Sequence, residues 1–265
     1  MLIIGESLNA TIPKVGQAIQ SRDAAFVSKL AQEQRDAGAQ MLDVNAAVPG
    51  GNETEDLTWL VTTVQAAVDV PLMLDSASPD ALRGAIAVCK QRPLVNSVSG
   101  EPKKLEKVLP LVAEYGCSVV ALCIGEKGIP GTPEARLDVA RLIVQRAGQL
   151  GIKPESIYID PLVLTIATDI QSARISLATI ELIRGGITGV HTIGGISNVS
   201  FGLPGRSLLN AAFVAMAAGL GMDAFLVNVR DRYVIATISA ANTLAGNDTR
   251  CRDYLRAYRA GRFKV

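Results

Sequence analysis

Residues 194–206 read GGISNVSFGLPGR, and this stretch decides the fold expected for the chain. It has the form of a short apolar strand that ends in Ser197 and Asn198 and continues into a loop rich in glycine and proline. The same form recurs, because Asp75, Asn96 and Asp160 each stand at the end of a short apolar run. In α/β barrels the residues that carry the chemistry lie where strands end. These polar residues are therefore candidates for one common site.

Short apolar runs alternate with longer amphipathic runs along the whole chain, which is typical of repeated strand–helix units. Strands are expected at residues 2–5, 41–44, 71–74, 93–95, 119–124, 157–159, 192–196 and 224–227. Helices are expected at residues 23–37, 54–68, 79–89, 103–115, 133–150, 172–184, 208–220 and 231–244. The helix at 208–220 is almost wholly apolar, so we expect it to be buried on more than one side. Eight units in 265 residues favour a single (β/α)8 TIM barrel that spans residues 1–265.

Composition and charge argue against several classes of protein. The chain is 49% hydrophobic, which suffices for a large core, and its net charge is only +1, from 26 Lys and Arg against 25 Asp and Glu. No broad field is present that would attract nucleic acid or an acidic membrane. The amino terminus lacks the basic segment of a signal peptide, and the longest apolar stretch is shorter than the ~18 residues of a membrane span. We therefore expect a cytoplasmic protein.

The cysteines and the single histidine do not form a metal-binding pattern. Cys117 and Cys123 flank an apolar run, where buried free thiols are expected, because free cysteine behaves as a small hydrophobic residue. His191 is expected at the start of the seventh strand, at the end opposite the site, so no catalytic role is assigned to it.

The carboxyl ends of all eight strands of such a barrel open on one face. A ring of polar residues is therefore expected there, formed by Glu6, Asn45, Asp75, Asn96, Asp160, Asn198 and Asn228. Any one of them could instead cap a helix or stabilise a turn. The ring contains no lysine, arginine or histidine, so it is not suited to phosphate or acyl transfer. Its carboxylates could hold a divalent metal, or they could accept hydrogen bonds from a flat heterocycle such as a pterin.

Five motifs, in order along the chain, closely resemble the pterin-binding methyltransferase family. They are Ile4-Gly5-Glu6-Ser7-Leu8-Asn9, Leu74-Asp75-Ser76, Val95-Asn96-Ser97, Ile159-Asp160-Pro161 and Ile196-Ser197-Asn198-Val199-Ser200. The family includes methyltetrahydrofolate:corrinoid/iron-sulfur protein methyltransferase and the folate domain of cobalamin-dependent methionine synthase. The resemblance covers essentially the whole chain.

The resemblance implies a role for each matching residue. Asp75, Asn96 and Asp160 match residues that hydrogen-bond the pterin ring, and Asn198 matches the asparagine near N5, the nitrogen that carries the methyl group. Asn198 and Asp160 are thus the expected catalytic pair, since together with water they favour a protonated N5. Other residues expected close to the pterin are Glu6, Asn9, Asn45 and Ser197. Arg206 is a possible contact for the glutamate tail of folate.

The activity implied is movement of a methyl group between N5 of tetrahydrofolate and the cobalt of a corrinoid, in a direction that the sequence leaves open. Tetrahydrofolate or 5-methyltetrahydrofolate is then the substrate, and no metal is bound by this chain. An Asp-x-His-x-x-Gly signature is absent from the sequence, so the corrinoid (cobalamin) is expected on a separate partner protein. A homodimer is expected from the family and from the apolar C-terminal helices.

Two other functions stay open at this point. Dihydropteroate synthase shares the barrel and the pterin pocket, but the eighth strand here ends in Val227-Asn228-Val229-Arg230, without an Arg-x-His pair for pyrophosphate. The other alternative is a non-catalytic subunit that binds the pterin and transfers nothing.

Overall fold

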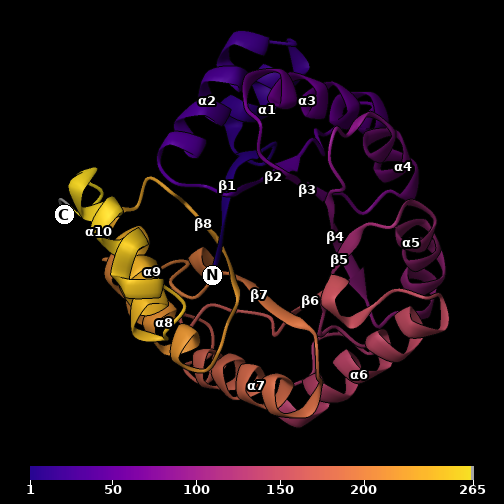
Figure 1. Cartoon of the computed structure of the whole chain (residues 1–265). Helices are drawn as coiled ribbons and strands as arrows, with labels where there is room; N and C mark the ends of the chain where they lie inside the picture. Colours follow the sequence, from indigo (N-terminus) through magenta and orange to yellow (C-terminus); the bar gives the residue numbers. More distant parts are fainter. Residues whose placement is uncertain (264–265) are drawn as a thin grey trace.

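Eight parallel strands close into a barrel in the order β1 to β8, and helices surround it (Figure 1). The computed structural model describes residues 1–263. The strands are β1 (Leu2–Asn9), β2 (Met41–Asn45), β3 (Leu72–Asp75), β4 (Leu94–Ser99), β5 (Ser118–Leu122), β6 (Ile157–Asp160), β7 (His191–Gly195) and β8 (Ala224–Val227). The barrel closes where β1 pairs with β8, with Gly5 opposite Val227. The predicted (β/α)8 barrel is confirmed.

Ten α-helices lie within the described residues, eight of which match the predicted ones to within a few positions. The helices are α1 (Pro13–Gln20), α2 (Ala24–Asp36), α3 (Glu53–Ala67), α4 (Pro79–Val88), α5 (Pro102–Tyr115), α6 (Pro133–Gln149), α7 (Ser172–Gly186), α8 (Arg206–Gly219), α9 (Arg232–Leu244) and α10 (Arg252–Arg259). Helices α1 and α10 were not predicted. A further difference is that β7 ends at Gly195, and residues Ile196–Asn198 form a short 3-10 helix instead of the last strand positions.

Five of the described helices, α2, α3, α4, α6 and α9, begin at capping side chains that are distinct from the polar residues of the strand ends. Ser78 accepts a hydrogen bond from the Ala81 amide at the start of α4, and Asp231 accepts one from the Val234 amide at the start of α9. Such caps satisfy amides that have no partner in the first helical turn. Asp75 lies three positions before the cap of α4 and is therefore free for another task.

The barrel interior is packed by one layer of apolar side chains: Ile4, Met73, Leu94, Val120, Ile193 and Ala224. Successive side chains of a strand point to opposite faces, so the next inward residues lie two positions further along each strand. On β1, β3 and β4 these are Glu6, Asp75 and Asn96. The inward-facing side chains are therefore apolar in one layer and polar in the next layer toward the carboxyl ends of the strands.

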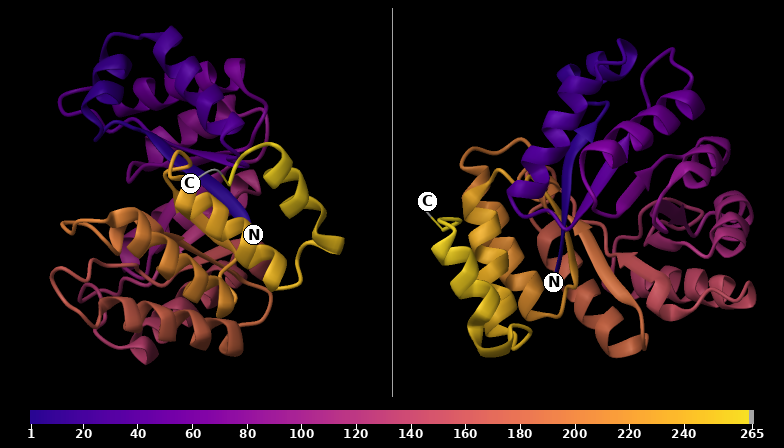
Figure 2. Two further views of the ribbon diagram at one scale, coloured as in Figure 1. Left: turned by 90° about the vertical axis from the view of Figure 1, so that its left-hand side faces the viewer. Right: turned by 45° about the horizontal axis from the view of Figure 1, so that its top comes forward.

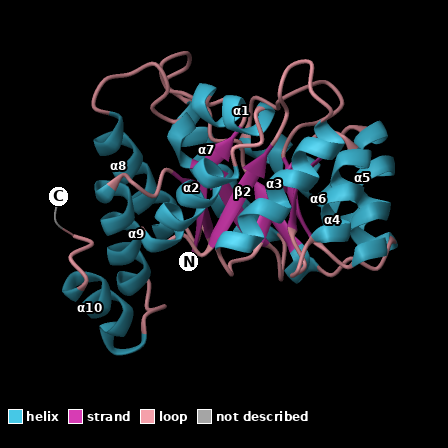
Figure 3. Cartoon of the chain, turned by 90° about the horizontal axis from the view of Figure 1, so that it is seen from above, coloured by secondary structure: helices cyan, strands magenta, loops and turns pink. Residues whose placement is uncertain are grey.

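Figure 3 shows this polar end on the side of α1, whereas α10 lies beside α9 toward the opposite end of the strands. Both views of Figure 2 place α9 and α10 next to the amino terminus. The amino group of Met1 donates a hydrogen bond of 2.9 Å to the Asn242 side chain in α9. The C-terminal helices thus lie outside the barrel beside its amino-terminal end, away from the polar end.

The apolar helix α8 is not buried on more than one side, which corrects the expectation from sequence. Its inner face packs into the core, but Leu208 and Met216 are 72% and 57% exposed. Tyr233 and Leu244 of the neighbouring α9 are also exposed. Together these four residues form an uncovered apolar face on α8 and α9, which lie side by side in Figure 1.

Two further observations concern the cysteines and the length of the helices. Cys117 and Cys123 are buried free thiols, as predicted. Within residues 1–263, we find no helix with the length and apolar character needed to cross a membrane.

Candidate active site

The polar end of the barrel brings together residues from both ends of the sequence. The Ser197 hydroxyl donates a hydrogen bond of 2.5 Å to the Glu6 carboxylate, across 191 positions of chain. The β1–β2 register shifts between Gly5 and Leu8, which is the place of Glu6. Such irregularities re-aim side chains next to active sites. Burial raises the pKa of Glu6, and the hydrogen bond from Ser197 and the charge of Arg206 oppose that rise.

Asp75 and Asn96 stand side by side at the ends of β3 and β4. Asn45, at the end of β2, donates a hydrogen bond of 3.1 Å from its side-chain nitrogen to the Asp75 carboxylate. Burial raises the pKa of Asp75, whereas the bond from Asn45 lowers it and the charge of Glu53 raises it further. Three predicted site residues thus lie on three adjacent strands of one wall.

Asp43 belongs to this wall, although the sequence analysis did not identify it. It lies in the middle of β2, opposite Met73, one layer deeper than Asp75, and is only 1% exposed. Burial holds its pKa well above the ordinary value, the negative charge of Asp75 adds to that effect, and a hydrogen bond with Asn96 opposes it. Its oxygen Oδ1 has no hydrogen-bond partner within the part of the chain that the structure describes. An acceptor buried without a partner is costly, so this oxygen is suited to meeting a bound ligand or a water.

Asp160 ends β6 on the opposite wall of the barrel. Its carboxylate accepts a hydrogen bond of 2.7 Å from the Leu162 amide. Burial raises its pKa to about 6, against the opposing effects of that bond and of the Arg136 charge. Arg136 of α6, also not predicted, is buried and donates to the backbone oxygens of Pro161 at 2.6 Å and Leu162 at 3.0 Å. It therefore fixes the chain that follows Asp160.

Asn198 follows β7 in the short 3-10 helix, with its side chain exposed to solvent at the mouth. Its amide nitrogen lies close over Gly195. A Cβ atom on Gly195 would lie 3.1 Å from this nitrogen, closer than most real Cβ contacts. The glycine thus allows the amide to fold back over the end of the strand.

Arg206, at the start of α8, holds the loop that carries Ser197 and Asn198. Its guanidinium donates 2.7 Å to the Ser197 backbone oxygen and 3.1 Å to the Ser200 hydroxyl, and it lies 5.9 Å from the centre of the Phe201 ring. Its Nε and one terminal nitrogen therefore already donate hydrogen bonds within the loop.

Asn9, which the resemblance placed near the pterin, and Asn228, a member of the predicted ring, form local turns. The Asn9 side-chain oxygen accepts from the Thr11 amide and hydroxyl, and the Asn228 oxygen accepts from the Arg230 amide. Such bonds to the backbone two residues ahead stabilise turns. These two asparagines shape the loops after β1 and β8, and neither side chain joins the Glu6–Ser197 or Asn45–Asp75 contacts.

The arrangement is chemically suited to a flat ligand with several N–H donors. Glu6, Asp43, Asp75 and Asp160 supply acceptors with raised pKa values, and Asn45, Asn96 and Asn198 supply amides that both donate and accept. Within residues 1–263, no group of three or more His, Cys, Asp and Glu side chains is placed to hold a metal ion. His191 lies at the other end of the barrel, at the start of β7, where its ring stacks on Tyr158 at 4.7 Å.

Comparisons with known proteins agree with this chemistry. The family model described as "Pterin binding enzyme" matches residues 5–228. The chain is 39% identical over 264 residues to the "Methylcorrinoid:tetrahydrofolate methyltransferase" of Eubacterium limosum, which covers 99% of this chain and 97% of that protein. It is 34% identical over 241 residues to the "Methionine synthase" of Mycobacterium tuberculosis, covering 86% of this chain but only 20% of that longer protein.

One solved structure shows the likeness of fold. It is a dihydropteroate synthase from Coxiella burnetii in complex with pteroic acid, with a TM-score of 0.70 over 93% of this chain and 94% of that chain. The sequence identity is only 17%, so this likeness concerns the fold alone.

Proposed function

The chain belongs to the pterin-binding enzyme family, and on this basis we propose that it is a methyltransferase acting between the cobalt of a corrinoid and N5 of tetrahydrofolate. The observation that carries the proposal is the identity of 39% over nearly the full length of both chains to a protein named for this reaction. The same relative suggests the direction, from the methylcorrinoid to tetrahydrofolate. The substrate is then tetrahydrofolate, and the corrinoid arrives on a partner protein.

The pterin ring lies within the polar end of the barrel in this proposal. Asp75, Asn96 and Asp160 hydrogen-bond its ring nitrogens and amino group, because carboxylates and amides complement an edge of N–H donors. Asp43 is added to this set, since its unpartnered Oδ1 faces the same interior. Glu6 and Ser197 lie on the opposite side of the mouth. Arg206 contacts the first glutamate of folate in this proposal.

The methyl step is a displacement at carbon. The lone pair of N5 forms the new bond to the methyl carbon while the carbon–cobalt bond breaks, and the electron pair of that bond stays on cobalt as Co(I). N5 then carries a positive charge together with its original proton, which must leave. Asp160, with a pKa of about 6, is largely ionised at neutral pH and accepts this proton directly or through water. The same steps in reverse would supply the proton that makes N5 a leaving group.

Asn198 contributes by hydrogen bonding to N5 as its charge changes. An amide does not ionise at neutral pH, so its contribution is orientation and electrostatic stabilisation, which matter most in the transition state. Removing one such group from an enzyme typically costs about 3 kcal/mol of activation free energy.

The two alternative functions are less well supported. A dihydropteroate synthase reaction releases pyrophosphate and needs cations at the end of β8, whereas the Arg230 that follows this strand is ion-paired with Glu33 and no Arg-x-His pair is present. A non-catalytic pterin-binding subunit would bind tetrahydrofolate but would leave a methylated corrinoid unchanged. Single-turnover mixing with a methylated corrinoid separates this subunit from the transferase, because only the transferase yields 5-methyltetrahydrofolate.

The exposed surface and the cysteines bear on the oligomeric state and the cellular location of the protein. We infer a homodimer formed through the exposed apolar face of α8 and α9, because monomers rarely leave such faces uncovered. The corrinoid protein then docks at the mouth, where cobalt must approach N5. A cytoplasmic location is consistent with free buried cysteines, which are typical of a reducing compartment.

A further inference from the structure

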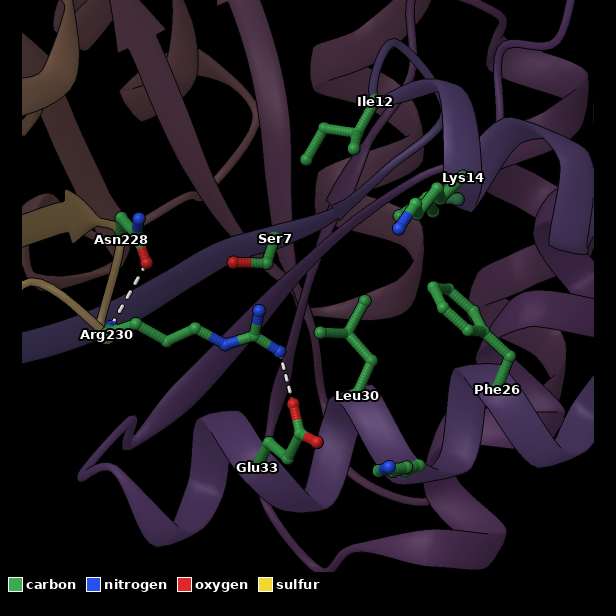
Figure 4. A pocket seen from close by; sticks show the side chains of 10 residues that line it. Ser7, Ile12, Lys14, Phe26, Leu30, Glu33, Asn228 and Arg230 are labelled. Atoms are coloured by element: carbon green, nitrogen blue, oxygen red, sulfur yellow. Dashed lines mark hydrogen bonds and ion pairs between the residues drawn. The ribbon is translucent and has the colours of Figure 1, made fainter.

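A second pocket lies beside the barrel mouth, between β1, α1, α2 and the end of β8 (Figure 4). Its volume is about 520 Å³, which is within the range of pockets that bind small molecules. Neither the methyl step nor the pterin ring uses it.

The pocket opens immediately next to the proposed pterin site. Ser7, which lines it, follows Glu6 of the mouth, and Asn228, which also lines it, is the residue after Val227 at the end of β8. β1 and β8 are hydrogen-bonded to each other as far as Gly5 and Val227, so this wall of the barrel separates the two sites. A ligand tail that leaves the mouth reaches the pocket over the loops that follow β1 and β8, to which Asn228 and Arg230 belong.

The walls of the pocket are apolar, and its rim is basic. Ile12, Phe26 and Leu30 provide the apolar surface, and Figure 4 shows Lys14 above it and Arg230 with Glu33 on the far side. Glu33 is ion-paired with Arg230. Lys14 of α1 and Lys29 of α2 have no carboxylate within 4.0 Å among residues 1–263, so both cations are available to a ligand.

We propose that this pocket binds the γ-linked glutamates that extend the tail of folate, with Lys14 and Lys29 holding their carboxylates. The inference rests on the proposed function, since that function supplies the folate. A folate leaves its pterin through an aromatic aminobenzoyl group and then carries a chain of carboxylates, and this order matches an apolar wall followed by a basic rim. Each added glutamate contributes one α-carboxylate, so two lysines suit a tail of two or three glutamates.

The test compares tetrahydropteroyl-monoglutamate with tetrahydropteroyl-triglutamate, by measuring the Kd of each for the full-length chain at low and at high salt. Wild type should bind the triglutamate about tenfold more tightly, because two exposed ion pairs are worth roughly 1 kcal/mol or somewhat more. The preference should shrink at high salt. In the double variant Lys14→Gln/Lys29→Gln the two folates should bind with nearly equal Kd. The double variant Lys103→Gln/Lys107→Gln, on α5 and outside this pocket, is the matched control and should keep the preference.

Three results would overturn the inference. Wild type could bind both folates equally, or the preference could persist in Lys14→Gln/Lys29→Gln, which would place the tail elsewhere. In the third result, Lys14→Gln/Lys29→Gln still binds the triglutamate more tightly than the monoglutamate but transfers the methyl group more slowly from a corrinoid protein. The two lysines would then bind an acidic segment of that partner protein. Methyl transfer to the monoglutamate from methylcobalamin or a methylated corrinoid protein tests the proposed function alone. Failure with every methylated corrinoid overturns that function, whereas normal transfer without a chain-length preference overturns only this inference.

Discussion

The side-chain amide nitrogen of Asn198 lies over Gly195, 3.1 Å from the position that a Cβ atom would take there. The backbone of Gly195 has φ −78° and ψ 95°, a conformation open to any residue. A methyl group at this position would therefore displace the neighbouring amide by a few tenths of an ångström without straining the backbone.

Replacing this glycine tests whether the position of Asn198 matters. Gly195→Ala should slow methyl transfer about tenfold while the fold and the affinity for tetrahydrofolate persist, because small displacements of a positioned group cost much of its effect. Single-turnover rates and a tetrahydrofolate Kd measure the two quantities. Gly148→Ala is the control, since a Cβ at Gly148 in α6 meets nothing within 4 Å. Equal rates for wild type and Gly195→Ala would show that the amide position has no bearing on the reaction.

The pKa of Asp160, raised to about 6 by burial, predicts how Asp160→Asn changes stability with pH. Between about pH 4 and 6 the folded chain keeps a proton that the unfolded chain has released, so this group makes the folded state less stable as pH rises through that window. Asparagine does not ionise, so Asp160→Asn removes this loss of stability. We expect Asp160→Asn to raise the free energy of unfolding by roughly 3 kcal/mol at pH 7.5 and by little at pH 4. Urea unfolding at both pH values measures this, and an equal change at both would refute the assignment.

The same substitution should slow transfer, because an amide cannot accept the proton that N5 releases. The wild-type rate should increase as pH rises through about 6, and this dependence should be lost in Asp160→Asn.

Asp43 is predicted to contact the pterin through its unpartnered oxygen. Asp43→Asn should weaken tetrahydrofolate binding by about tenfold, since a hydrogen bond contributes about 1 kcal/mol and a buried donor left without its partner costs somewhat more. The free energy of unfolding should stay equal or rise, because the buried carboxyl has an unfavourable environment in the free protein. Calorimetric titration and thermal unfolding give the two values. A variant that binds tetrahydrofolate like wild type would remove Asp43 from the pocket.

The exposed face of α8 and α9 predicts the oligomeric state. Wild type should be a dimer by light scattering, and Leu208→Glu/Met216→Glu should be a monomer, because two buried charges oppose an apolar interface. Leu150→Glu, at an exposed apolar residue after α6, should remain a dimer. A monomeric wild type would contradict the inferred assembly.

The barrel was predictable because its strands and helices differ so clearly in hydrophobic period. Helix α10 was not, since it spans only eight residues and none of them is buried, so no burial in the core accompanies its short helical pattern. Helix α1 contains Gly16, which weakens a helical signal. Packing requires glycine at this position, because a Cβ atom added to Gly16 would lie 2.7 Å from the backbone oxygen of Ala10. The sequence does not reveal this contact.

The site was predictable only in part, for a similar reason. Asp75, Asn96 and Asp160 follow apolar runs, so strand ends alone identify them. Asp43 lies inside a strand and Arg136 inside a helix, where a charged residue is usually directed to solvent. Their burial depends on closure of the barrel, as does the contact between Ser197 and Glu6, which join strands at opposite ends of the chain.

The most direct test of the proposed function is an anaerobic single-turnover reaction of this chain with tetrahydrofolate and a methylated corrinoid, either methylcobalamin or a methylated corrinoid protein. The proposal predicts that the methyl–cobalt spectrum gives way to that of Co(I) while one equivalent of 5-methyltetrahydrofolate forms. Asn198→Ala should slow this step by on the order of 100-fold, with tetrahydrofolate still bound. If tetrahydrofolate binds but the methyl–cobalt spectrum persists with every methylated corrinoid supplied, the chain is not a methyltransferase of this kind.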